Sequence, residues 1–390
     1  MRICYVTQEY PPDTAKGGIA AQTIVKATQL AHRGHDVHVI TRAGERAGSW
    51  TTDGVHIQRL IQPKLSAHTE IADWVAWSSD AAAAVAALHA QNPIDLVEFP
   101  EWACEGYVHL LNRTEWYRPR TIISLHGPLV MFAREIGWPS LDSTFYRVGK
   151  SMEAFCLEEA DGVYTSSQSS LDWCAREHGI DTSSIQTVHS GVDIELFHRQ
   201  SEPAEQPTVV YAGRIAENKG VLTLLKAVIE VSKEFPSVRL ILVGRGDEAV
   251  FTRLTSLARE ANFSGIEFRG FVTRESLAKE ISSAHVFAAP SYFEGGPVFA
   301  NLEAMACGLP VVACRGTGAA DVIKDGVTGL LVPPREVKPL AKSISRLLQD
   351  PVLSDSIGQA AKEYVVTHAS TDVCIDRLEN LYREFISDRS

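Results

Sequence analysis

The stretch that decides the fold is PSYFEGGPVFANLEAMACGLP, at residues 290–310. It predicts the end of a strand, then a glycine loop, then a helix that begins near Pro297 and stops at Gly308. The start of a helix leaves unpaired backbone N–H groups at a positive end, which favours a bound phosphate. Gly295 and Gly296 carry no Cβ, so a ligand can approach their main chain closely.

Two glutamates flank this predicted anion site. Glu294 precedes the glycines, and Glu303 lies about two helical turns into the helix. We expect Glu294 to lie beside a sugar on one side of a diphosphate and Glu303 beside a ribose on the other. Glycine loops before helices are common in α/β proteins, so ordinary surface charge is the alternative explanation for both carboxylates.

Residues 303–312 read EAMACGLPVV, and this segment resembles the signature of the retaining glycosyltransferases of family 4, which have the GT-B fold. That family usually has one residue fewer between the two glutamates than the eight found here, at positions 295–302. We place the extra residue in the loop. The resemblance implies that the loop and the helix start hold the donor diphosphate, through Gly295, Gly296, Pro297, Val298 and Phe299.

The composition favours an enzyme of two domains, because 390 residues are too many for one ordinary core. A net charge of −11 argues against a nucleic-acid partner and weakens attraction to an anionic membrane. The N-terminus reads as a strand rather than a signal peptide, and no apolar run approaches the roughly 20 residues of a membrane span. Seven scattered cysteines without a CxxC pair suit reduced thiols in a cytoplasmic protein.

Strand-like and helical segments alternate in two successive series. The first series has strands at 1–7, 36–41, 96–99, 121–125, 162–165 and 185–189, and the second has strands at 209–212, 239–243, 266–269, 286–289 and 311–314. Residues 196–208 contain two prolines and predict a linker. We therefore predict an α/β protein with two Rossmann-like, doubly wound domains at 1–195 and 208–370. The resemblance implies that they face each other across a cleft and that a helix within 371–390 packs back on the first domain.

Two cations follow the first strand of the second series, in AGRIAENKG at residues 212–220. Arg214 and Lys219 match the family pattern Gly-Arg-x4-Lys-Gly, which implies that both bind the donor diphosphate. Two fixed positive charges can stabilise a departing diphosphate as its charge builds. Without that pattern, a solvated loop pair would be the preferred interpretation.

Three further predicted contacts come from the resemblance. His126, at the end of the strand TIISL, is expected to contact the donor sugar from the first domain. Gly17 and Gly18 match a glycine pair that opens a helix toward the diphosphate and the acceptor. Phe271 and Val272 match the segment where the nucleobase meets the main chain. A structural histidine and a plain helix-start turn are the alternatives for the first two.

The segment GRGDEA at residues 244–249 fits a weak dinucleotide fingerprint and would support a nicotinamide oxidoreductase. It falls in the middle of the chain rather than in a first βαβ unit, which counts against that function. The sequence has no Asp-x-Asp motif of metal-dependent sugar transferases, and Arg214, Lys219 and a helix end can neutralise the diphosphate. We therefore expect no metal and no separate cofactor.

The predicted function is retaining transfer of a hexosyl-type sugar from a nucleoside diphosphate-sugar to an acceptor hydroxyl, with a UDP-sugar as the first candidate donor and a GDP-sugar as the second. A non-hydrolysing sugar-nucleotide epimerase of the same architecture and a nicotinamide oxidoreductase stay open as alternatives. Aromatic residues at 99–107 and 131–146 predict stacking against an acceptor sugar or lipid, or core packing. Glu98, Glu101 and Glu105 are expected to crowd the first loop, which disfavours an anionic acceptor. We therefore expect a neutral saccharide or small-molecule acceptor and no firm membrane anchoring.

Overall fold

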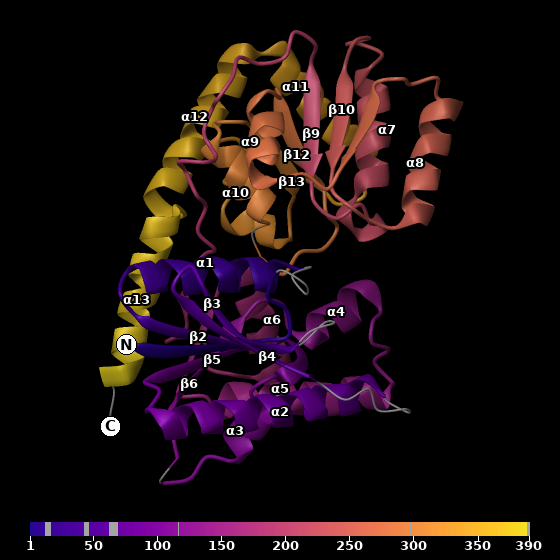
Figure 1. The fold of residues 1–390 in the computed structure, drawn as a ribbon. Coiled ribbons are helices and arrows are strands. Elements are labelled where there is room, and N and C mark those ends of the chain that lie inside the picture. Colours follow the sequence, from indigo (N-terminus) through magenta and orange to yellow (C-terminus); the bar gives the residue numbers. More distant parts are fainter. Residues whose placement is uncertain (12–16, 43–46, 62–68, 116, 297, 388–390) are drawn as a thin grey trace. The chain divides into compact units, whose positions relative to one another are not determined.

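The computed structural model describes residues 1–11, 17–42, 47–61, 69–115, 117–296 and 298–387 (Figure 1). The chain divides into two units. The first unit contains Met1–Gly191 together with Asp372–Ser390, and the second contains Val192–Thr371. Each unit is built on one mostly parallel sheet, so the predicted fold class of two α/β domains is confirmed.

The sheet of the first unit has eight strands in the order β3-β4-β2-β1-β5-β6-β7-β8. Its strands are β1 (Arg2–Thr7), β2 (Asp36–Arg42), β3 (Gly48–Thr52), β4 (Val55–Leu60), β5 (Leu96–Pro100), β6 (Arg120–Leu125), β7 (Gly162–Thr165) and β8 (Gln186–Thr187). The order reverses between β1 and β5, and in such sheets ligands bind outside the carboxyl ends of the strands at that reversal. The antiparallel hairpin β3–β4 was not predicted, although the Asp53-Gly54 turn between its strands is a common hairpin signal.

Helices cover both faces of this sheet. They are α1 (Gly18–His32), α2 (Glu70–Gln91), η1 (Trp102–Cys104), α3 (Tyr107–Leu111), α4 (Leu129–Ile136), α5 (Thr144–Glu159), α6 (Gln168–His178) and the last helix α13 (Thr371–Ser387). One buried cluster joins the sheet to α1 and α13, and a second joins it to α2, α5 and α6. Figure 1 shows α1 and α13 on the side of the sheet opposite to α2 and α5.

The sheet of the second unit has six strands in the order β11-β10-β9-β12-β13-β14, with the reversal between β9 and β12. Its strands are β9 (Thr208–Ala212), β10 (Arg239–Val243), β11 (Ile266–Gly270), β12 (Val286–Ala289), β13 (Val311–Cys314) and β14 (Leu330–Val332). Its helices are η2 (Glu217–Lys219), α7 (Val221–Val231), α8 (Glu248–Glu260), α9 (Arg274–Ser282), α10 (Phe299–Ala306), η3 (Gly318–Asp321), α11 (Val337–Gln349) and α12 (Pro351–His368). Every neighbouring pair in this sheet is parallel.

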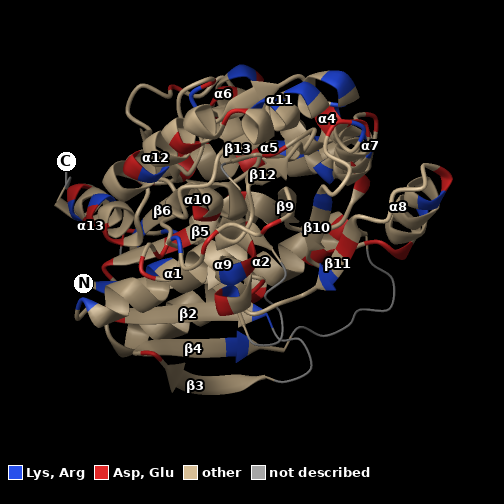
Figure 2. Cartoon of the chain, turned by 90° about the horizontal axis from the view of Figure 1, so that it is seen from above, with Lys and Arg blue, Asp and Glu red and all other residues tan. Residues whose placement is uncertain are grey.

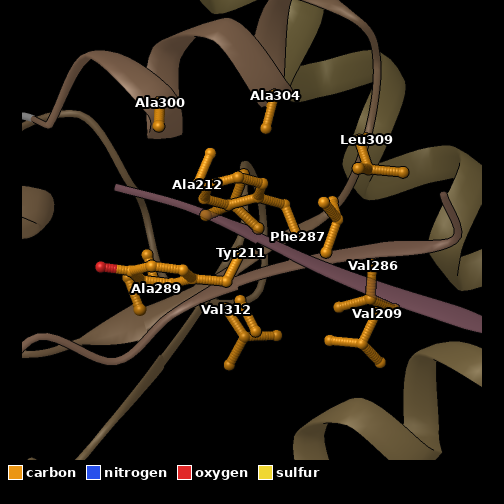
Figure 3. Close-up of a cluster of buried hydrophobic side chains, with 14 of the residues drawn as sticks. Val209, Tyr211, Ala212, Val286, Phe287, Ala289, Ala300, Ala304, Leu309 and Val312 are labelled. Carbon is orange, nitrogen blue, oxygen red and sulfur yellow. The ribbon is translucent and has the colours of Figure 1, made fainter. Parts of the chain in front are cut away.

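The core of the second unit fixes α10 against the strands at the reversal. Ala300 and Ala304 of α10 point toward the buried side chains of β9 and β12, Phe287 among them (Figure 3). Small residues on this helix face let the helix backbone approach the sheet closely, which holds the start of α10 beside the carboxyl ends of the strands. The helix is two residues shorter at each end than the predicted range of 297–308, and Pro297 lies outside the described residues.

The boundary between the units differs from the predicted linker at 196–208. Val192 and Phe197 are fully buried and belong to the hydrophobic core of the second unit, so the chain enters that unit at Val192. The two prolines that suggested a linker follow this buried segment rather than precede it. Of the helices within the described ranges, none combines the length and the apolar composition needed to cross a membrane.

Candidate functional site

Three predicted site residues of the second unit lie where its strand order reverses, between β9 and β12. Arg214 and Lys219 follow β9, and Glu294 follows β12, its neighbour on the other side of the reversal. The backbone N–H of Tyr292 donates to the carbonyl of Asn218 at 2.9 Å, which ties the two loops together. The loops that carry both cations and Glu294 therefore lie side by side at the carboxyl end of the sheet.

Lys219 and Glu294 form a direct ion pair. The Nζ atom of Lys219 lies 2.6 Å from Oε1 of Glu294, and the two side chains are 25% and 13% exposed. Lys219 is the last residue of the short helix η2, so its position follows from a turn rather than from a flexible loop. A cation and a carboxylate that are both mostly buried at this edge can bind a charged ligand and a hydroxyl-bearing ligand next to each other.

Arg214 does not share this contact. Its guanidinium lies 3.9 Å from the carboxylate of Asp247, and its side chain is 67% exposed. The hydroxyl of Tyr211 donates to the carbonyl of Arg214 at 2.8 Å, so the backbone of the residue is anchored while the charged group is exposed. The sequence predicted the two cations as a pair, whereas the structure gives each a different carboxylate partner. Asp247 was missed, because its pairing with Arg214 links two separate loops.

The glycine loop is packed against η3. The backbone N–H of Gly318 donates to the carbonyl of Glu294 at 3.1 Å, and a Cβ on Gly318 would lie 2.3 Å from the carbonyl carbon of Gly296. The loop then reaches Val298, the N-cap residue of α10, and Phe299, its first residue. The N-terminus of α10 therefore opens directly from the loop that carries Glu294, Gly295 and Gly296.

Glu303 is buried on α10 and pairs with Arg274 of α9. Their side chains approach to 3.2 Å, with the carboxylate 4% and the guanidinium 52% exposed. Burial raises the pKa of Glu303 to about 7, against the lowering effect of Arg274. The guanidinium also lies over the ring of Phe197, 5.0 Å from its centroid. Sequence reasoning missed Arg274, although it follows the predicted nucleobase segment by two residues.

Phe271, which is predicted to lie beside the nucleobase, is largely exposed. Its side chain is 74% exposed, and the guanidinium of Arg245 lies 5.1 Å from the centre of its ring. Val272 is half-buried and packs against the core of the unit. Figure 2 shows basic and acidic ribbon segments interspersed along β10 and β11, where Arg239 and Arg269 both pair with Glu267.

The glycines of the suspected dinucleotide fingerprint have a different explanation. A Cβ on Gly244 would lie 1.9 Å from the carbonyl oxygen of Gly213, and one on Gly246 would lie 1.9 Å from that of Ile215. The backbone N–H of Ile215 donates to the carbonyl of Arg245 at 2.8 Å. Both glycines therefore serve close packing of two loops against each other.

In the first unit, His126 follows β6 and Gly17 caps the start of α1. The imidazole Nε2 of His126 lies 3.2 Å from the hydroxyl of Ser124, and burial, with a smaller effect of the charge of Lys26, lowers its pKa to about 3. His126 is therefore neutral at neutral pH and can exchange a hydrogen bond with a sugar hydroxyl. Gly18 is the first residue of α1, and a Cβ there would meet no atom within 4 Å.

The prediction of an exposed acidic loop in the first unit is wrong. Glu98, Glu101 and Glu105 are all buried, at 2%, 1% and 1% exposed. Each bonds to groups inside the unit: Glu98 to Lys26, Glu101 to the backbone N–H of His126, and Glu105 to the indole N–H of Trp77. Their charge therefore gives no argument against an anionic acceptor.

Family models match almost the whole chain. Residues 16–196 match the model described as "Glycosyltransferase Family 4", and residues 193–364 match the model described as "Glycosyl transferases group 1". The junction between these matches falls within a few residues of the boundary between the two units. The matches give no support to the epimerase and oxidoreductase alternatives.

Several characterised proteins are similar over most of their length. The D-inositol 3-phosphate glycosyltransferase of Mycolicibacterium smegmatis is 28% identical over 95% of this chain and 87% of its own. In fold, the chain is similar to sucrose-phosphate synthase from Thermosynechococcus elongatus, with a TM-score of 0.80, 23% identity and coverage of 99% of both chains. It is also similar to Anabaena HepE in complex with UDP and glucose, with a TM-score of 0.76, 20% identity and coverage of 98% of this chain and 100% of HepE.

Proposed function

Because this chain belongs to the family 4 glycosyltransferases, we propose that it transfers a hexosyl-type sugar from a nucleoside diphosphate-sugar to an acceptor hydroxyl with retention of configuration. The observation that carries the proposal is the Lys219–Glu294 pair, 2.6 Å apart beside the glycine loop and the start of α10. One group suits a diphosphate and the other suits sugar hydroxyls, and the helix start adds N–H donors.

Each residue has a separate proposed role at the donor. Arg214 and Lys219 stabilise the diphosphate as it leaves, Glu294 accepts hydrogen bonds from sugar hydroxyls, and Glu303 accepts them from the ribose. His126 contacts the sugar from the first unit, and Phe271 and Val272 lie beside the nucleobase. These two cations and the N-terminus of α10 supply the positive charge that a metal supplies in other sugar transferases, so we propose transfer without a metal.

Retention is proposed to follow from attack on the face that the diphosphate leaves. The bond between the anomeric carbon and the phosphate oxygen breaks, and the acceptor oxygen bonds to that carbon from the same side. The acceptor proton passes to the departing phosphate oxygen. Glu294 is not a covalent nucleophile in this scheme, because it accepts hydrogen bonds from sugar hydroxyls while the acceptor oxygen attacks the anomeric carbon directly.

The acceptor is proposed to bind to an aromatic surface of the first unit, formed by Trp102, Phe132, Trp138 and Phe145. Trp138 is 39% exposed, and its ring centre lies 6.1 Å from that of Trp102 and 5.6 Å from that of Phe145. Phe132 extends this surface toward the predicted site, because a Cβ on Gly127, next to His126, would lie 3.2 Å from its ring. Aromatic faces stack against the C–H groups of sugar rings, which supports a saccharide or small glycoside.

The donor is proposed to be a UDP-sugar, with a GDP-sugar as the second candidate; a complex of HepE with UDP and glucose supports the first.

A screen would test the proposal. It would combine nucleoside diphosphate-sugars with neutral glycosides and with D-inositol 3-phosphate, the anionic compound in the name of the mycobacterial relative. We expect release of nucleoside diphosphate that depends on the acceptor and is unaffected by EDTA. The anomeric coupling constant of the product, measured by NMR, should show the configuration of the donor; an inverted product would refute retention.

A cytoplasmic location stays a prediction from the sequence.

A further inference from the structure

A buried carboxylate holds the backbone at the predicted catalytic histidine. Glu101 immediately follows β5, at the strand reversal of the first unit, and is 1% exposed. Its two carboxylate oxygens accept hydrogen bonds from the backbone N–H of His126, at 2.8 and 2.9 Å. The backbone N–H of Gly127 donates to the same carboxylate.

All of these partners are donors. The carboxyl oxygens of Glu101 accept from both N–H groups, whereas the amide of a glutamine would present a donor in place of one of these oxygens. Burial raises the pKa of Glu101 to about 8, and the N–H groups of Gly127 and His126 oppose this increase. Burying a carboxyl group costs free energy unless the group is hydrogen-bonded, and the two N–H donors supply these hydrogen bonds.

The backbone that carries Glu101 is strained. Ala103 and Cys104 have φ values of 59° and 50°, a left-handed conformation that residues other than glycine rarely adopt. Both are 1% exposed, so the surrounding structure maintains the strain. Backbone strain of this kind is concentrated at sites where a geometry has to be fixed.

The far end of the strained turn is anchored as firmly as its start. Glu105 accepts hydrogen bonds from the indole N–H of Trp77 at 2.7 Å and from the backbone N–H of Gln8 at 3.2 Å. Gln8 follows β1, the strand on the other side of the reversal. The turn is therefore braced against two other parts of the unit, which keeps Glu101 in one position.

We propose that Glu101 is a positioning residue, whose carboxylate fixes the backbone of His126 and Gly127 and so sets the imidazole at the end of β6. The hydroxyl of Ser170 donates to the carbonyl of His126 at 3.1 Å, so His126 is held at both its backbone N–H and its backbone carbonyl. This inference rests on the proposed function, in which the imidazole contacts the donor sugar. Displacement of a contact group by about 1 Å costs on the order of 100-fold in rate.

The test is Glu101→Gln. This substitution keeps the shape of the side chain but replaces one acceptor oxygen with an NH2 group, which is a donor and cannot accept from the backbone N–H groups. We expect kcat to fall by about 10- to 100-fold while the KM for the donor changes by less than about threefold, because the donor diphosphate is bound by the second unit. Glu101→Asp keeps the carboxyl group on a shorter side chain and should show an intermediate loss of kcat. This variant replaces Glu101→Gln in the test if the glutamine variant does not fold.

The matched control is Asp161→Asn. Asp161 is a buried carboxylate that accepts from the backbone N–H of Thr121 at 2.8 Å, at the opposite end of β6. It removes a carboxylate that holds the backbone at the other end of the same strand, and kcat should stay within about twofold of the wild type. An equal loss of kcat in both variants, or an unchanged kcat in folded Glu101→Gln, would overturn the inference.

A second measurement separates this inference from the proposed function. If the wild type transfers no sugar from any donor, the proposed function fails, and the amide proton shifts of His126 and Gly127 decide the inference. Strong hydrogen bonds to a carboxylate move amide protons downfield, so both signals should move upfield in Glu101→Gln and stay in place in Asp161→Asn. Unchanged shifts in Glu101→Gln would overturn the positioning role.

Discussion

The Lys219–Glu294 ion pair has to open, at least in part, before either side chain can bind a donor. Exposed ion pairs contribute about 0–1 kcal/mol, but removing one partner of a mostly buried pair leaves an uncompensated charge. A diphosphate offers Lys219 more negative charge than Glu294 does, and sugar hydroxyls can replace the lysine beside the carboxylate. The ion pair therefore holds both side chains in place in the free protein. It dissociates when a ligand provides a partner for each of them.

Lys219→Ala should lower kcat by on the order of 100- to 1,000-fold and raise the donor KM by much less, because the charge on the diphosphate is greatest as it leaves. Steady-state kinetics with the best donor of the screen would measure both. The matched control is Arg253→Ala, which removes an exposed arginine that pairs with Glu217 on the same short helix η2. A rise in KM without a fall in kcat would mean that Lys219 binds the ground state only.

Glu303 should make donor binding depend on pH near neutrality. Its folded-state pKa is raised to about 7, so the carboxylate gains a proton as the pH falls from 8 to 6 and loses its ability to accept from both ribose hydroxyls. The Kd of a nucleoside diphosphate-sugar, whose phosphates do not titrate in this range, should therefore rise as the pH falls through 7. Calorimetric titration of the wild type and Glu303→Gln at several pH values would check this. The variant should show weak binding without this dependence, and a wild-type Kd that stays constant from pH 6 to 8 would contradict the ribose role.

At the scale of elements, the sequence predicted a strand correctly where an apolar segment precedes a predicted site residue. The segments before His126, Arg214 and Glu294 are strands in the structure, within one or two residues of the predicted ends. Local patterns could not predict the Glu303–Arg274 pair or the bonds of Glu101 to His126, because these contacts join segments far apart in the chain. The left-handed backbone at Ala103 and Cys104 also has no sequence signal, since neither residue favours it.

The contact between η3 and the glycine loop predicts the effect of a single methyl group. Gly318→Ala would place a Cβ against the backbone of Gly296, which has to move, and the resulting strain should cost about 1–3 kcal/mol. The displaced loop should bind a nucleoside diphosphate more weakly. Gly358→Ala is the matched control, because its Cβ would lie 2.1 Å from the carbonyl oxygen of Gly308, away from the loop. Both variants should melt at lower temperature, and equal binding by the two would contradict the role of this contact.

At the scale of the whole molecule, the second unit is one continuous segment whose two ends are joined. The backbone N–H of Val192 donates to the carbonyl of Ala369 at 2.9 Å, and that of Thr371 donates to the carbonyl of Val192 at 2.9 Å. One hydrophobic core fills the unit from Val192 to Ala369. The unit therefore closes on itself, and the described residues of the first unit contribute none of the side chains of this core.

Residues 192–371 expressed alone should consequently fold cooperatively and bind a nucleoside diphosphate. Circular dichroism on heating and calorimetric titration would measure the two properties, with Lys219→Ala in the same fragment as the control for specific binding. A fragment that shows no cooperative melting would contradict the division of the chain into these units.

The reverse holds for the first unit, whose buried core includes Tyr382 of α13. The Tyr382 hydroxyl donates to the carboxylate of Glu98 and lies 3.0 Å from the hydroxyl of Tyr5, and Glu98 is also the partner of Lys26. During synthesis on the ribosome, the residues of β1 to β8 emerge long before this helix does. The first unit therefore waits until the whole second unit has been translated. Until then its buried ion pair lacks the Tyr382 hydroxyl, and α1 covers this face of the sheet without α13. The first unit can therefore complete its fold during synthesis only after the second unit, which lies between its two segments, has been made.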